Sequence, residues 1–301
     1  MPLWIPITIA AAFLQNLRST WQKQLSGELS AAAATYVRFS FGLPVATIYL
    51  AGLHNLGGYA LPSPNATFLV YCLIGGITQI IGTFLLVALF AYRNFAVGTT
   101  YSKTETVQAA LFGIIVLGDH PSLGAVAAIL VSFVGVVAIS MAKSNLTLGN
   151  FGRSLSEKPT LMGIGTGAGF GISAVCYRAA SLSLNGDGVF ISAAYTLVTV
   201  LLIQTVLMGA WLAWREPEQI VKTAKAWKVS LLVGIAGALA SVGWFTAMTI
   251  ENAAYVRALG QIELVFTFAT SYFLFKEKTG WLEFLGIALV VAGLFLLLFL
   301  R

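Results

Sequence analysis

Apolar runs of about 20 residues, the length that crosses a bilayer as one helix, follow one another along almost the whole chain. Short breaks of Gly, Pro, Asn or charged residues separate them. The pattern predicts an all-α polytopic membrane protein with ten transmembrane helices. The expected spans are residues 3–25, 30–53, 67–91, 95–117, 122–142, 160–182, 188–214, 228–250, 253–275 and 280–300. The first is the least apolar and needs protein neighbours.

The composition excludes a soluble globular protein. Of 301 residues, 58% are hydrophobic and 9% are charged, against roughly a quarter charged in soluble domains. The net charge of +6 comes mostly from cations at predicted helix ends, so we expect the lipid bilayer as a partner and no nucleic acid. Ten spans are enough to enclose a path within one chain, and we expect a monomer or a homodimer.

The Lys and Arg residues indicate which side of the membrane each connection faces. The connections after even-numbered spans carry none of them, whereas those after odd-numbered spans carry eleven of the 17. These are Lys23, Arg93, Lys143, Arg153, Lys158, Arg215, Lys222, Lys225, Lys228, Lys276 and Lys278. By the positive-inside rule, both termini are expected on the non-cytoplasmic side. We predict an integral protein of a bacterial inner (plasma) membrane.

The two halves of the chain repeat each other weakly. A shift of 158 residues superposes polar or glycine positions that apolar composition alone rarely aligns: Asn94 on Asn252, Glu105 on Glu263, Asp119 on Glu277, Gly135 on Gly293 and Gly76 on Gly234. Because each half has five spans, an odd number, the second enters the membrane inverted. We predict a first five-helix repeat at 1–142, a linker at 143–159 and a second repeat at 160–301.

Motifs of enzymes and metal sites are missing from the sequence. Cys72 and Cys176 lie in apolar runs and indicate neither a disulfide framework nor a metal site. There is no Walker loop, no H-E-x-x-H and no G-x-S-x-G. We therefore expect no enzyme activity, no cofactor and no metal.

Glu105 and Glu263 fall near the middle of corresponding spans. A carboxylate at that depth costs on the order of 3 kcal/mol, so both should face the bundle interior. We expect one or both to carry a coupling proton or to hold a substrate ammonium. The alternative is a structural carboxylate bonded to a neighbouring Arg or hydroxyl.

Five cations also lie within predicted spans: Arg18, Arg38, Lys103, Arg178 and Arg257. They exceed the two central carboxylates by three charges, which a ligand carboxylate or phosphate would partly balance. Lys103 and Arg38 lie about 12 Å deep, at 1.5 Å per helical residue, and are the better candidates to bind substrate. Arg178 and Arg257 lie near the outer edge and can snorkel, which favours a structural role.

Other polar residues are candidates to line a cavity. Tyr101, Glu105 and Gln108 share one face of a continuous helix, and Gln15 and Gln79 lie on polar stripes of other spans. Polar contacts between helices would explain the presence of these side chains nearly as well as a role in lining a cavity. Overlapping G-x-x-x-G units from Gly163 to Gly171 predict close helix packing, and Pro44 predicts a kink.

The fourth and ninth spans carry a specific resemblance. The stretch from Thr104 to Gly113, followed by Gly118-Asp119, resembles the EamA type of the drug/metabolite transporter superfamily. Ile262 to Phe266, ending in Lys276-Glu277, repeats it. Tyr36-Val37-Arg38-Phe39 and Trp21-Gln22-Lys23 are similar to further motifs of that family.

The resemblance implies a secondary transporter that works by alternating access, with its cavity between two inverted halves and the fourth and ninth helices in the cavity wall. The family's proline after the glutamate is replaced by Thr106 and Leu264. Our leading hypothesis is an exporter of a small polar metabolite such as an amino acid, with a proton as candidate counter-ion. A flippase for a lipid or lipid-linked substrate is the alternative, and a scaffold protein would move no solute.

Overall fold

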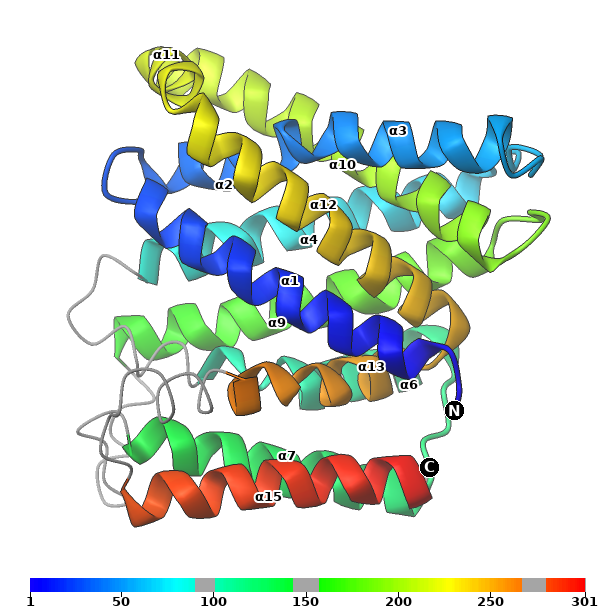
Figure 1. The fold of residues 1–301 in the computed structure, drawn as a ribbon, viewed down its shortest axis with the longest axis vertical. Helices are drawn as coiled ribbons and strands as arrows, with labels where there is room; N and C mark the ends of the chain where they lie inside the picture. Colours follow the sequence, from blue (N-terminus) through cyan, green and yellow to red (C-terminus); the bar gives the residue numbers. More distant parts are fainter. Residues whose placement is uncertain (90–100, 143–156, 267–279, 301) are drawn as a thin grey trace.

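The computed structural model describes residues 1–89, 101–142, 157–266 and 280–300, and every regular element in those ranges is a helix (Figure 1). The helices are α1 (Trp4–Leu25), α2 (Ala31–Ser40), α3 (Gly42–Asn55), α4 (Ala66–Leu89), α6 (Glu105–Leu117), α7 (Leu123–Ala142), α9 (Lys158–Leu182), α10 (Val189–Arg215), α11 (Pro217–Lys225), α12 (Trp227–Ile250), α13 (Ala253–Gly260) and α15 (Trp281–Leu300). The predicted all-α class is confirmed.

Six helices within the described ranges are long and apolar enough to cross a membrane: Ala31–Asn55, which joins α2 and α3, and α4, α9, α10, α12 and α15. α6 and α7 are apolar but shorter. Six clear spans are fewer than the ten predicted. One reason is that α1 carries charged and polar side chains in its second half. Another is that the predicted spans 95–117 and 253–275 lie partly outside the described residues.

The second predicted span is broken where a proline removes a backbone donor. α2 ends at Ser40 and α3 begins at Gly42, with Phe41 forming a turn between them. Pro44 has no N–H to donate to the carbonyl of Ser40, four residues earlier. The kink predicted from Pro44 is therefore confirmed, displaced to the N-terminal side of the proline.

The helices pack in close pairs, with α1 along α12, α4 along α9 and α7 along α15. The last pair lies at one edge of the bundle in Figure 1. α9 also packs on α6, and glycines allow both approaches. A Cβ at Gly169 would lie 2.6 Å from the carbonyl oxygen of Thr78 in α4. One at Gly167 would lie 2.8 Å from Thr104 Oγ1, just before α6. The close packing predicted for this glycine-rich helix is confirmed, as is the need of α1 for protein neighbours.

The two ends of the bundle differ in charge. At the end that holds α11 and the turn after α1 (Figure 1), the described chain places the basic side chains Lys23, Arg215, Lys222, Lys225 and Lys228. The two chain termini lie together at the opposite end (Figure 1). The separation matches the charge pattern along the sequence, while the side of the membrane that each end faces stays a prediction.

Candidate functional site

A cavity of about 200 Å³ lies between the helices, and both halves of the chain line it. The first half contributes α1, α2, α4 and the segment before α6, and the second half contributes α9, α12, α13 and the residues that follow α13. Six charged side chains share its wall: Arg18, Arg38, Lys103, Glu105, Arg257 and Glu263. A chamber so polar inside an apolar bundle is the natural candidate for a binding site.

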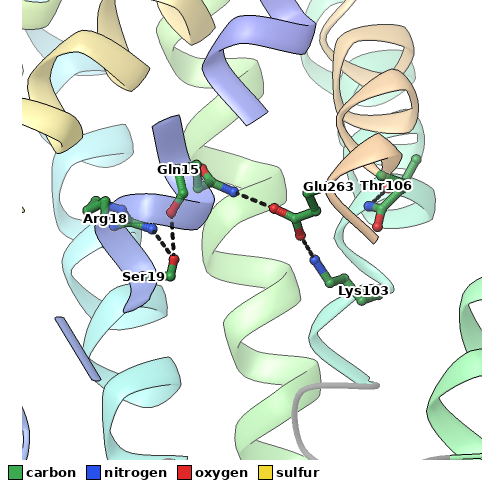
Figure 2. A network of polar contacts seen from close by, with 7 residues as sticks. Gln15, Arg18, Ser19, Lys103, Thr106 and Glu263 are labelled. Carbon is green, nitrogen blue, oxygen red and sulfur yellow. Dashed lines mark hydrogen bonds and ion pairs between the residues drawn. The ribbon is translucent and has the colours of Figure 1, made fainter. Parts of the chain in front are cut away.

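Lys103 and Glu263 form an ion pair in this cavity. The side chains are 20% and 16% exposed, respectively, so the pair is largely shielded from bulk solvent. Gln15 adds a second contact, because its Nε2 donates to Glu263 Oε2 at 3.4 Å. Figure 2 shows the Glu263 carboxylate between Gln15 and Lys103. One carboxylate of the second half is thus held by α1 and by the turn before α6.

The helices that carry the two glutamates are broken at matching positions. A turn at Lys103 and Thr104 precedes α6, which begins at Glu105. α13 ends at Gly260, and a turn at Gln261 precedes Glu263. Under the 158-residue shift Lys103 superposes on Gln261, so both breaks lie directly before the glutamates. The breaks form without the proline usual in the family, and they precede the glutamate rather than follow it.

A hydrogen bond ties the two broken segments together. Gln261 Nε2 donates to Thr106 Oγ1 at 3.0 Å, and both side chains are buried. Glu105 lies in the first turn of α6, where the partial positive charge of a helix N-terminus favours a carboxylate. The local structure therefore places one glutamate at a helix start and the other beside a lysine.

Three arginines complete the charged wall. Arg18 donates to Ser19 Oγ at 3.3 Å, and Arg38 Nη1 donates to Thr83 Oγ1 at 2.9 Å. The guanidinium of Arg257 lies 5.0 Å from the centre of the Trp244 ring, a cation–π geometry. Arg257 was expected to snorkel, but it is buried and lines the cavity. The reason is that every residue of α13 is buried among its neighbours.

Arg178 has a different place. It donates to the backbone carbonyls of Met248, at 2.7 Å, and of Glu251 at the C-terminal end of α12. Carbonyls at a helix end have no partner within the helix, so this arginine closes the end of α12. The structural role predicted for Arg178 is confirmed.

A buried polar cluster supports the wall on the side of α4. Gln79 Oε1 accepts from Tyr177 Oη at 3.0 Å and from Gln204 Nε2 at 2.9 Å. Tyr177 Oη also donates to the carbonyl of Gly75 at 2.8 Å, and its ring stacks on Phe245 with centroids 4.4 Å apart. Gln79 and Tyr177 both reach the cavity. Tyr177 was missed from the sequence, although Ser173 and Ser181 at helical spacing mark a polar stripe on its helix.

Two of the predicted lining residues do not reach the cavity. Tyr101 is buried, and Gln108 Nε2 donates to Thr104 Oγ1 at 2.7 Å and to the carbonyl of Ile164 at 3.5 Å. The prediction assumed one continuous helix through this region. The turn at Lys103 and Thr104 separates Tyr101 from α6. Gln108 lies one turn after Glu105 in α6, and its side chain is held by Thr104 and Ile164.

The remaining candidates, Gln15, Arg38, Gln79, Lys103, Glu105 and Glu263, all lie on the cavity wall. No group of three or more His, Cys, Asp or Glu side chains in the described ranges is arranged to hold a metal ion. The arrangement can bind a polar solute away from lipid. Its lysine and arginines can each pair with a carboxylate, so ion pairs can be exchanged within the cavity.

Comparisons with known proteins give a consistent result. Residues 158–299 match the EamA-like transporter family, which confirms the resemblance seen in the sequence. A stretch of 100 residues is 26% identical to an uncharacterized transporter in the cobO 3′ region of a Sinorhizobium species, covering 33% of this chain and 70% of that one. A protein crystal structure of 16% identity superposes with a TM-score of 0.71 over 97% of this chain and 94% of its own. That likeness concerns the fold alone.

Proposed function

We propose that the protein is a secondary active transporter. The match of residues 158–299 to the EamA-like transporter family supports a membrane transporter of the drug/metabolite type. The protein exports a small polar metabolite, such as an amino acid, by alternating access. The observation that carries the proposal is the charged cavity, which both halves of the chain line and which contains the Lys103–Glu263 ion pair.

The packing supports two inverted five-helix repeats. If α1 corresponds to α9 and α4 to α12, the pair α4–α9 is the counterpart of α1–α12, and both pairs pack closely. Gly76 of α4 faces Gln204 of α10, and Gly234 of α12 faces Phe41 between α2 and α3. Under the 158-residue shift the two glycines superpose, and α10 corresponds to the span of α2 and α3, so the contacts join corresponding helices. Such symmetry is what alternating access by rocking halves requires.

We assign roles from the contacts. Lys103 and Arg38 receive an anionic group of the substrate, which competes with Glu263 for the lysine. Glu105 and Glu263 hold a coupling proton or a substrate ammonium. Gln15 and Gln79 orient the bound solute. Binding therefore opens the contact that joins the two halves, which couples occupancy to rearrangement.

The test is solute flux in proteoliposomes that contain the purified full-length chain. Counterflow of a labelled amino acid, saturable and dependent on the protein, is the expected result. Glu105→Gln should abolish flux while the protein keeps its elution volume and its cooperative thermal transition. Glu218→Gln, which changes an exposed carboxylate of α11, should leave flux unchanged. A Glu105→Gln protein that transports at the wild-type rate would remove Glu105 from the mechanism.

A flippase for a lipid or lipid-linked substrate is the second candidate. An apolar groove of about 280 Å³ lies between α2, α4 and α10, lined by residues such as Ile81, Phe84 and Trp211, and it suits an acyl chain. The same liposomes test it with a fluorescent phospholipid. Protein-dependent scrambling in the absence of solute flux would favour the flippase.

A further inference from the structure

The charges around the cavity do not balance. Four cations line it, Arg18, Arg38, Lys103 and Arg257, against two carboxylates, Glu105 and Glu263. The described wall therefore carries two positive charges in excess when all six groups are ionised. Excess charge inside an apolar bundle is costly unless a partner neutralises it.

The two carboxylates cannot neutralise all four cations. Glu263 pairs with Lys103 and also attracts Arg18, and Glu105 is the one other carboxylate on the described wall. Arg18, Arg38 and Arg257 are 4%, 8% and 6% exposed. Their contacts are the hydroxyls of Ser19 and Thr83 and the indole of Trp244, and none of these carries a negative charge.

Donors also remain unused in the described protein. Arg18 Nη1 and Arg257 Nε are buried and have no hydrogen-bond partner. A buried donor without a partner is costly, and a guanidinium offers its N–H groups in the fork that matches carboxylate and phosphate oxygens. Arg178 Nε, outside the cavity, also has no partner, although Arg178 Nη1 donates to two carbonyl oxygens.

We propose that the cavity selects a small organic anion, whose carboxylate or phosphate oxygens bind Arg18 and Arg38. This inference rests on the proposed transport function and narrows its substrate class from polar metabolites to those with net negative charge. The size of the cavity limits the ligand to a small molecule, and Trp244 and Phe245 offer an apolar wall for its carbon skeleton. A cationic solute would meet four cationic side chains and only two carboxylates on the described wall.

Binding is tested by the thermal midpoint of the purified full-length protein with four probes at millimolar concentration. Succinate carries two carboxylates, glycerol 3-phosphate a phosphate, glutamine no net charge and lysine a positive charge. We expect the midpoint to rise with one or both anions and to stay unchanged with glutamine and lysine. The anion that gives the larger rise in the thermal midpoint identifies carboxylate or phosphate as the recognised group. Equal or larger shifts with glutamine or lysine overturn the proposal.

Variants test the arginines and the charge balance separately. Arg18→Gln and Arg38→Gln should each weaken anion binding about tenfold or more, the value of a charged hydrogen bond. Arg38→Lys keeps the positive charge and should lose less anion affinity than Arg38→Gln. The comparison also keeps the test valid if one variant fails to fold. Glu105→Gln should strengthen anion binding, because it removes a repulsive charge. Weaker anion binding by a folded Glu105→Gln protein contradicts the charge argument.

The outcomes separate this inference from transport itself. Anion binding without any solute flux in liposomes keeps the anion site and contradicts the transport function. Saturable flux of glutamine or lysine, without a response to either anion, keeps the transport function and overturns the anion site.

Discussion

Lys103 and Glu263 stand 160 residues apart in the chain, yet their side chains form an ion pair at the cavity. Lys103 lies in one helix break, and Glu263 lies two residues after another, at Gln261. The two breaks superpose under the 158-residue shift. Interrupted helices free backbone groups and let side chains of facing segments approach. The pair therefore joins the two halves at the point where both chains deviate from a regular helix.

Exchange of the two charges tests the pair. Lys103→Glu and Glu263→Lys should each lower the thermal midpoint strongly, because breaking a buried pair costs about 3 kcal/mol or more. The double variant should recover a large part of the loss, as a double-mutant cycle measures. If the losses of stability of the two single variants simply add in the double variant, the two side chains do not depend on each other.

The sequence predicted the helical class, the kink near Pro44, the packing of α9 and the central glutamates, because each depends on a local pattern. Polar residues in apolar runs must face the interior, and glycines at regular spacing must meet a neighbour. The partner of Lys103 was beyond reach. Nothing in a single sequence identified Glu263, 160 residues away, as that partner.

Two of the errors come from helix breaks. Tyr101 was assigned to the cavity on the assumption of a continuous helix, and Arg257 was assigned to the outer edge on its distance from the end of a predicted span. Gln108 has another reason, because its side chain bonds to Thr104 and Ile164. Helix breaks without proline are not visible in the sequence, because hydrogen bonds between elements stabilise them. The bond from Gln261 to Thr106 is one such contact.

The packing of α9 predicts a strong effect at Gly169. Gly169→Ala places a Cβ within 2.6 Å of the Thr78 carbonyl oxygen and 2.9 Å of Gly82 Cα. Because these are backbone atoms in a tight helix pair, overpacking should cost about 1–3 kcal/mol, seen as a lower thermal midpoint. Gly52→Ala is the matched control in α3, where a Cβ meets nothing within 4 Å. Equal midpoints for the two variants would contradict the close approach of α4 and α9.

The polar cluster behind the cavity predicts a cost for one hydroxyl. Tyr177→Phe removes the donor to the Gly75 carbonyl and to Gln79 Oε1 and leaves these buried acceptors with fewer partners, at about 1–3 kcal/mol. The thermal midpoint should fall, and solute affinity should fall with it because Gln79 loses its orientation. Tyr195→Phe serves as the control, since its ring packs on Phe68. A Tyr177→Phe protein with unchanged midpoint and affinity would show that the cluster does not support the wall.

The charge difference between the bundle ends predicts the orientation in the membrane. The end that carries Lys222, Lys225 and Lys228 should face the cytoplasm, where positively charged connections are retained, so that the C-terminus lies on the other side. A C-terminal alkaline phosphatase fusion should then be active in cells and a green fluorescent protein fusion dark. Fusions after Lys225 should behave in the opposite way. Fluorescence from the C-terminal fusion would reverse the orientation, and with it the proposed direction of export. In the proposed inverted repeat both orientations are structurally equivalent, and only the cations distinguish them.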